Sequence, residues 1–152
     1  MAITPTLDGM LFTVPFTSTT DFTELADNCE RFVEVIVECD DPAQKMALCG
    51  RLSACLDLLQ PTLLEPIPTY LVASLTVEEI PADLPTLEME ADQLGDYCQA
   101  LTQLLLSGSL ATKTERTIRD LLYQLVFYFA GTLKAPRWLK TEDGIVSLEG
   151  AY

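Results

Sequence analysis

Residues 21–38 read DFTELADNCERFVEVIVE, an amphipathic pattern that predicts a helix. At 100° per residue its apolar side chains share one face of a helix, and its five acidic side chains after Asp21 share an arc about 120° wide on the opposite side. The acidic set is Glu24, Asp27, Glu30, Glu34 and Glu38. Asp21, followed three residues later by Glu24, is typical of a helix start. A strand over 33–39 also fits the β-branched residues there, but the length of the pattern favours a helix.

A second helix is predicted after a very short connection. Asp41 suits the N-cap and Pro42 the first helical position, which assigns the Asp40–Asp41 pair to a helix start. The inward apolar positions are Met46, Cys49, Leu52, Cys55, Leu56 and Leu59. We expect this helix to reach about Gln60 and to end at Pro61. Two helices joined so closely predict an antiparallel hairpin.

Two further helices are predicted in the second half. The third runs from about Thr86 or Leu87 to Leu106 and stops at Ser107-Gly108. The fourth begins near Thr112, with a capping box to Glu115, and runs to about Leu133. The inward positions are Leu87, Ala91, Leu94, Cys98, Leu101 and Leu105 in the third helix, and Ile118, Leu121, Leu122, Leu125, Val126, Phe129 and Leu133 in the fourth.

The fourth helix is apolar nearly all round. Tyr123, Phe127 and Tyr128 lie away from the centre of its buried stripe. This pattern predicts either a central helix or an oligomer interface at these three aromatic residues.

The remaining segments carry the prolines and the β signals. Residues 1–18 predict an extended arm with a short strand from Leu11 to Phe16. Residues 61–85 predict a proline-rich connection whose one short element, within 69–77, is a helix or a strand, and this connection is a candidate binding region. Residues 136–150 predict a β-hairpin around Asp143-Gly144 that pairs with the arm. We therefore expect one all-α domain over 1–152, a bundle of about four helices with a proline-rich crossover and a small hairpin near the termini.

Composition excludes several classes of chemistry. The chain has 152 residues, 49% of them hydrophobic, and no His. Without His there is no Ser-His-Asp or Cys-His catalysis and no His-ligated metal. No glycine-rich phosphate-binding motif is present. We expect no catalytic residues, no metal and no cofactor.

Cysteine usage predicts a reducing compartment. The five residues Cys29, Cys39, Cys49, Cys55 and Cys98 are odd in number and include no C-x-x-C pair. They suit buried structural thiols rather than a redox or zinc site. The first residues lack the basic start of a secretory signal, so we expect a cytoplasmic protein.

The negative charge is concentrated in the first two-thirds of the chain. The net charge is −14, and residues 1–98 hold 18 acidic residues against three basic ones. In the first helix only Arg31 offsets the acidic arc, although like charges four residues apart destabilise a helix. A nucleic acid or an anionic membrane is a poor partner for such a surface, whereas a basic protein is the natural one. The apolar stretch 121–133 is also too short to span a membrane.

These patterns predict a non-catalytic protein-binding module whose acidic face occupies a basic site of a partner, as inhibitors, immunity proteins and nucleic-acid mimics do. The candidate partner-binding residues are Asp27, Glu30, Glu34, Glu38, Glu78, Glu79, Asp83 and Glu88. A solvated helix face explains the same acidic arc without any partner. The alternative function is a chaperone or adaptor for a basic or partly unfolded client, acting through the apolar fourth helix. A homodimer is also predicted, with the basic cluster Lys134, Arg137 and Lys140 facing the acidic half of a second copy.

Overall fold

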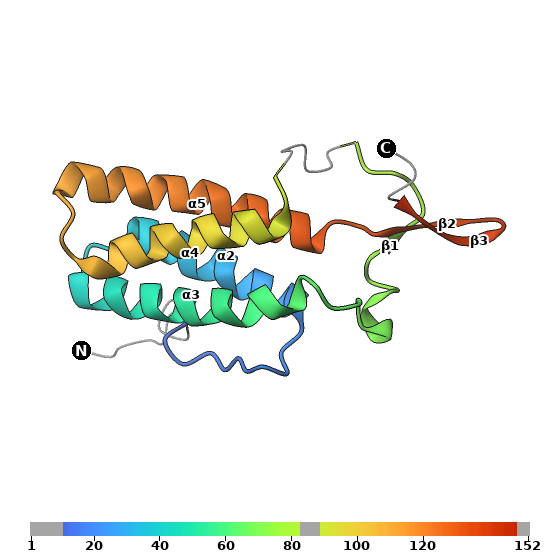
Figure 1. Cartoon of the computed structure of the whole chain (residues 1–152), viewed down its shortest axis with the longest axis horizontal. Coiled ribbons are helices and arrows are strands. Elements are labelled where there is room, and N and C mark those ends of the chain that lie inside the picture. The colour runs from blue at the N-terminus through green and yellow to red at the C-terminus, as the bar shows by residue number, and fades with distance from the viewer. Residues whose placement is uncertain (1–10, 83–88, 149–152) are drawn as a thin grey trace, which may run out of the picture.

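A computed structural model describes residues 11–82 and 89–148 of the chain. Its four long helices form a bundle (Figure 1) and are α2 (Phe22–Glu38), α3 (Pro42–Thr62), α4 (Ala91–Ser107) and α5 (Thr112–Lys134). Each helix packs against the next one along the chain, and α5 closes the bundle against α2. The predicted all-α bundle is confirmed.

The first two helices start where the sequence predicts. The Asp21 carboxylate accepts a hydrogen bond from the Glu24 amide at 3.0 Å. The Asp41 carboxylate accepts from the Ala43 and Gln44 amides at 2.9 and 3.4 Å, with Pro42 as the first helical residue. Both caps satisfy backbone donors that the helix itself leaves unpaired.

Two predicted helix limits and one predicted cap are wrong. Pro61 does not end α3 but lies inside it, and the helix continues to Thr62, whose hydroxyl donates to the Leu59 carbonyl at 2.6 Å. The fourth helix begins at Thr112 as predicted, but its N-cap is Ala111, which makes no side-chain bond, so the predicted capping box does not form. The helix expected from Thr86 or Leu87 begins at Ala91, after an extended Glu90; residues 83–88 lie outside the described residues.

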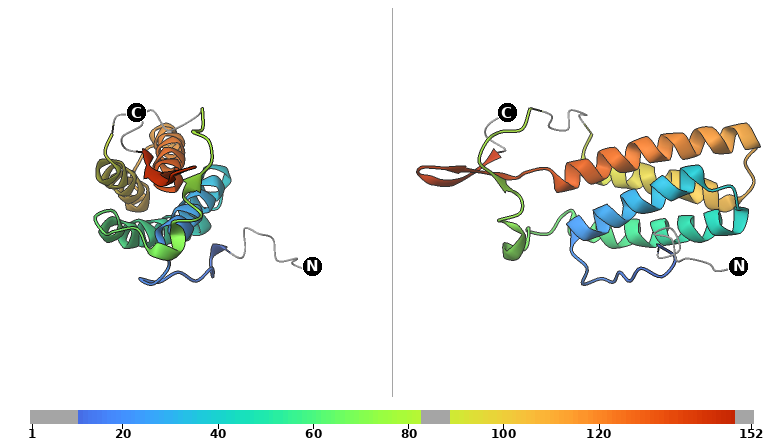
Figure 2. Two further views of the ribbon diagram at one scale, coloured as in Figure 1. Left: turned by 90° about the vertical axis from the view of Figure 1, so that its right-hand side faces the viewer. Right: turned by 180° about the vertical axis from the view of Figure 1, so that it is seen from behind.

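The crossover and the chain's end build a small sheet at one end of the bundle. Between α3 and α4 the chain forms the 3-10 helix η1 (Thr69–Leu71) and then the strand β1 (Thr76–Val77). The sequence left a helix and a strand open as alternatives here, and the segment contains one of each. The strand β2 (Trp138–Thr141) pairs in parallel with β1 and antiparallel with β3 (Gly144–Ser147). The hairpin projects beyond the helices (Figures 1 and 2), on the side away from the short α2–α3 and α4–α5 turns.

The predicted hairpin is confirmed, but its partner and the strand in the arm are wrong. In the register of β2 and β3, Thr141 lies opposite Gly144, so the two-residue turn is Glu142–Asp143. Residues 11–16 form no strand. They lie along the bundle instead, where Arg51 donates to the Val14 carbonyl and its guanidinium lies 4.7 Å from the centroid of the Phe16 ring. The backbone groups of a helix are bonded within the helix, so the bundle offers the arm no strand with which to pair.

The core runs along the bundle axis and draws on all four helices. Its largest fully buried side chains include Phe32 of α2, Leu52 of α3, Leu94 of α4 and Phe129 of α5. Two predicted core positions are wrong. Met46 is 41% exposed near the bundle end, and Leu121 is 45% exposed on the flank of α5. Within the described residues, no helix is both long and apolar enough to cross a membrane.

Candidate partner-binding site

More than half of the basic side chains are partly buried within the protein. Five of the nine Lys and Arg residues are half-buried, whereas 16 of the 19 described Asp and Glu residues are exposed. The half-buried cations are Lys45, Arg51, Arg119, Lys134 and Arg137, and the exposed ones are Arg31, Lys113, Arg116 and Lys140. The described surface is therefore more acidic than the composition alone implies.

At one end of the acidic arc, a lysine of the same chain neutralises part of the charge. The Lys134 ammonium lies 2.8 Å from an Asp27 carboxylate oxygen and also pairs with Glu30. Desolvation lowers the pKa of Lys134, but its hydrogen bonds to the two carboxylates outweigh this effect and raise the pKa overall. The expectation that only Arg31 offsets the arc is wrong, because Lys134, 107 residues away from Asp27, packs beside it. Lys134 is thus engaged within its own chain rather than available to a second copy.

At the other end of α2, Arg119 holds the helix terminus. Arg119 donates to the carbonyls of Ile36 and Cys39, both at 3.3 Å, and so caps the C-terminus of α2. Arg119 and Lys45 also pair with Glu115. The hydrogen bond from Lys45 is the main cause that lowers the pKa of Glu115. These bonds tie α2, α3 and α5 together and direct both cations inward.

Three acidic residues, Glu38, Asp40 and Asp41, lie at the turn between α2 and α3. A hollow of about 300 Å³ lies there, which we call the acidic hollow; it is lined by Phe12, Val35, Glu38, Cys39, Asp40, Asp41 and Gln44. Phe12 and Val35 are half-buried, and the carboxylates of Glu38, Asp40 and Asp41 are exposed. Within the described part of the chain no salt bridge reaches these three carboxylates.

This lining suits one kind of side chain. Lys and Arg carry an aliphatic stem that packs on apolar surface and a charged head that stays at its edge. Phe12 and Val35 supply the apolar surface, and the carboxylates supply charge-assisted acceptors for the head. The acidic hollow therefore combines apolar surface with carboxylate acceptors at its edge.

The structure separates the predicted acidic residues. Glu34 and Glu38 are exposed near the acidic hollow, and Glu38 lines it. Glu78 and Glu79 are also exposed, but they follow β1 at the opposite end of the bundle (Figure 1). Asp83 and Glu88 lie outside the described residues. The described candidates therefore form no single patch.

Sequence reasoning missed most of the lining of the hollow. It assigned Asp40 and Asp41 to a helix start, and Asp41 does cap α3. The adjacent carboxylates at the end of an acidic helix face were the available signal. The approach of Phe12 to Val35 carried no signal, because it depends on where the arm packs.

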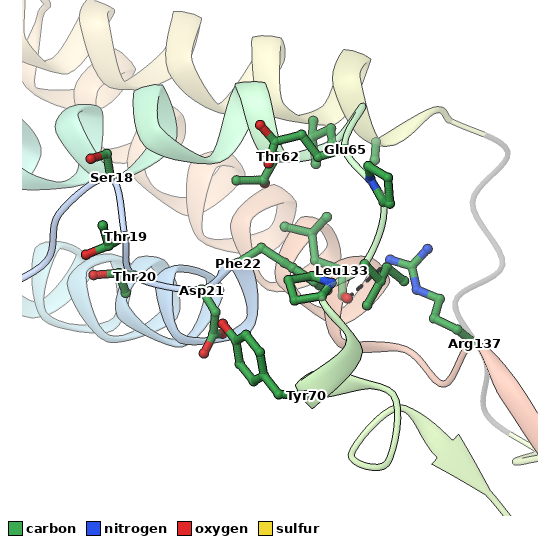
Figure 3. A pocket seen from close by; sticks show the side chains of 15 residues that line it. Ser18, Thr19, Thr20, Asp21, Phe22, Thr62, Glu65, Tyr70, Leu133 and Arg137 are labelled. Atoms are coloured by element: carbon green, nitrogen blue, oxygen red, sulfur yellow. Dashed lines mark hydrogen bonds between the residues drawn. The ribbon is translucent and has the colours of Figure 1, made fainter.

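Another cavity lies at the end of the bundle that carries the sheet (Figure 3). It has a volume of about 270 Å³ and lies between the turn before α2, the first part of the crossover and the end of α5. Asp21 and Arg137 line it, but Asp21 caps α2 and Arg137 donates to the Leu133 carbonyl at 3.3 Å. In this part of the predicted binding region, the Asp21 carboxylate and the Arg137 guanidinium are thus engaged in hydrogen bonds at helix ends. One of these groups is negative and the other is positive.

The predicted oligomer interface divides over two flanks of α5. The rings of Tyr123 and Phe127 lie 4.6 Å apart and follow Arg119 at intervals of four residues, so they lie on the flank that faces α2. Tyr128 lies on the other flank. All three side chains are half-buried.

The five thiols are free and mostly buried. Cys29, Cys49, Cys55 and Cys98 are buried, Cys39 is half-buried, and all five are free. The hydrogen-bonded neighbour Cys55, together with burial, raises the pKa of Cys29, while burial raises the pKa of Cys49 to about 11 and that of Cys98 to about 12. Thiolates, the reactive form, are therefore scarce near neutral pH at these three positions.

The comparisons with known proteins add no relative. No family model matches the chain, and neither a curated protein nor a solved structure matches it significantly.

Proposed function

We propose that this protein is a non-catalytic binding module that docks its acidic α2–α3 turn on a basic site of a partner protein. The observation that carries the proposal is the acidic hollow, where Glu38, Asp40 and Asp41 line the same cavity as Phe12 and Val35 and make no salt bridge among the described residues. The partner contributes an Arg or Lys side chain to the hollow.

The internal bonds of the cations support this assignment. Arg119 and Lys45 are the cations nearest in sequence or contact to the turn, and both point toward Glu115 or the end of α2. Glu34 and Glu38 extend the same negative surface along α2. A cationic partner is thus attracted at long range and gains short-range bonds at the hollow.

The proposed function predicts a defined change in affinity. We suggest titrating an arginine-rich peptide into the protein and into the variant Glu38→Lys/Asp40→Lys, and following binding by calorimetry. Asp41 is left unchanged because it caps α3. The variant is expected to lose at least about tenfold in affinity, and the affinity of the wild type is expected to fall steeply with salt.

A matched control separates local recognition from net charge. The variant Glu142→Lys/Asp143→Lys makes the same charge change at the exposed hairpin turn, at the other end of the bundle. It should keep most of the wild-type affinity. Equal losses in the two variants would refute a site at the hollow. Binding that does not depend on salt would favour the alternative of a chaperone that recognises apolar surface.

A further inference from the structure

The arm packs against α2 and α3 with every second side chain. Phe12, Val14 and Phe16 are half-buried, whereas Thr13 and Pro15 between them are exposed. This alternation places the even-numbered side chains toward the bundle. We call the line along which residues 12–16 lie against the two helices the seam.

One guanidinium of the chain itself lies in the seam. The Arg51 guanidinium carbon lies 4.7 Å from the centroid of the Phe16 ring and 5.7 Å from that of the Phe32 ring, and Arg51 donates to the Val14 carbonyl. Among the described residues no carboxylate forms a salt bridge with Arg51. Two aromatic faces and one backbone carbonyl therefore hold this cation.

The acidic hollow repeats this arrangement nearer to the α2–α3 turn. Three residues of its lining lie on the same sides of the arm, α2 and α3 as the three residues of the Arg51 position, at spacings of four, three and seven residues. The corresponding pairs are Phe12 with Phe16, Val35 with Phe32, and Gln44 with Arg51. All three steps lead toward the turn, because the arm and α3 both run opposite to α2 (Figure 1). The hollow is thus a second position of the seam, at which α3 supplies a neutral amide in place of a cation.

This second position suits a guanidinium better than an ammonium. It keeps an aromatic ring of the arm, Phe12, and adds the exposed carboxylates of Glu38 and Asp40. A guanidinium is planar and weakly hydrated, so it can stack on a ring while it donates two parallel hydrogen bonds to a carboxylate. An ammonium is compact and strongly hydrated, and it gains less from the ring. The chain's own side chains show the same contrast, since Lys45 pairs with a carboxylate and Arg51 lies over rings.

We propose that the acidic hollow selects arginine over lysine, with the partner's guanidinium stacked on Phe12 and bonded to the carboxylates of Glu38 and Asp40. The aliphatic stem of the arginine then packs against Val35. This selectivity rests on the proposed function, and it narrows the side chain that the basic partner inserts to arginine.

A pair of peptides tests the selectivity. The two peptides have equal length and charge, and one carries arginine wherever the other carries lysine. In calorimetry the wild type is expected to bind the arginine peptide at least about fivefold more tightly. In the variant Phe12→Leu the two affinities should become nearly equal, because leucine keeps an apolar side chain but lacks the ring. The control Phe127→Leu removes a half-buried ring outside the lining of the hollow and should keep the preference.

The outcomes separate the selectivity from binding itself. Equal affinities of the wild type for the two peptides overturn the selectivity, and so does a preference that persists in a Phe12→Leu variant shown by circular dichroism to be folded. A preference that Phe127→Leu abolishes equally also overturns it. If Glu38→Lys/Asp40→Lys still weakens both peptides in these cases, the proposed function stands without the selectivity. Binding of neither peptide to the wild type overturns both.

Nuclear Overhauser contacts test the stacked position in the complex. The side-chain protons of a bound arginine should show contacts to the ring protons of Phe12. A complex that forms without these contacts overturns the stacked position, whether or not the arginine peptide binds more tightly.

Discussion

Lys134, in the last turn of α5, lies with its ammonium 2.8 Å from the carboxylate of Asp27 in the second turn of α2, and it pairs with Glu30 as well. This contact closes the bundle between its first and last helices. The side chains are partly exposed, so solvent screens the attraction.

Replacing Lys134 by Met should destabilise the fold modestly. The change leaves Asp27 and Glu30 without their cation, and we expect a loss of about 0.5–1 kcal/mol in the free energy of unfolding. Because the pKa of Lys134 is raised in the folded state, its contribution is full below the unfolded pKa and disappears as pH rises through the folded pKa. Urea unfolding at neutral and strongly alkaline pH should show the difference between wild type and variant shrinking only in the alkaline range. A difference that persists there would contradict the assignment.

Glu115 should contribute to the loss of folding stability at acidic pH. Lys45 and Arg119 lower its pKa below the usual 4.5, so its contribution is present above that value and is lost as pH falls through the lower folded pKa. The variant Glu115→Gln should melt below the wild type at neutral pH, and the two melting temperatures should converge in acid. Parallel melting curves at every pH would show that Glu115 adds no pH-dependent stability.

Two glycines on facing helices should respond oppositely to alanine. A Cβ at Gly95 would lie 2.5 Å from the side-chain nitrogen of Gln60 and 3.3 Å from the ring of Phe129, whereas a Cβ at Gly50 meets nothing within 4 Å. Gly95→Ala should therefore destabilise by about 1–3 kcal/mol. Gly50→Ala should stabilise by about 0.5–1 kcal/mol, because glycine is the poorer helix former. Chemical unfolding of both variants checks the pair, and stabilisation by both would mean that α3 and α4 pack less closely at Gln60 than described.

The helix starts were predictable because their causes are local. Asp21 caps a backbone amide three residues on, and Pro42 favours a helix by its own ring. The limit missed at Pro61 differs from the predicted one by two residues, because several helix endings have similar energies.

Contacts between distant segments were not predictable from one sequence. Nothing near Thr76 indicates that it pairs with Trp138, and nothing near Asp27 indicates Lys134. The acidic hollow has the same origin. Its carboxylates are visible in the sequence, but Phe12 and Val35 come to line one cavity only in the folded chain, where Arg51 of α3 bonds to the arm at Val14 and lies over the ring of Phe32 in α2.

The thiols should differ in their reactivity. With a disulfide reagent at mildly alkaline pH, Cys39 should react first, because it is half-buried while the other four cysteines are buried. The raised pKa values of Cys29, Cys49 and Cys98 add to their protection. We expect one rapid equivalent and four more on unfolding. The variant Cys39→Ser should remove the rapid phase, and a rapid phase that survives would mean that a helix opens readily.

The location of a bound cationic peptide is the direct test of a binding site at the acidic hollow. Amide chemical shifts of the labelled protein, recorded during titration with an arginine-rich peptide, show which residues it contacts. We expect the largest changes at Phe12, at Val35 and from Glu38 to Gln44, and their loss in the Glu38→Lys/Asp40→Lys variant. Changes centred on Glu78, Glu79 or the hairpin turn, or spread evenly over every exposed carboxylate, would contradict it.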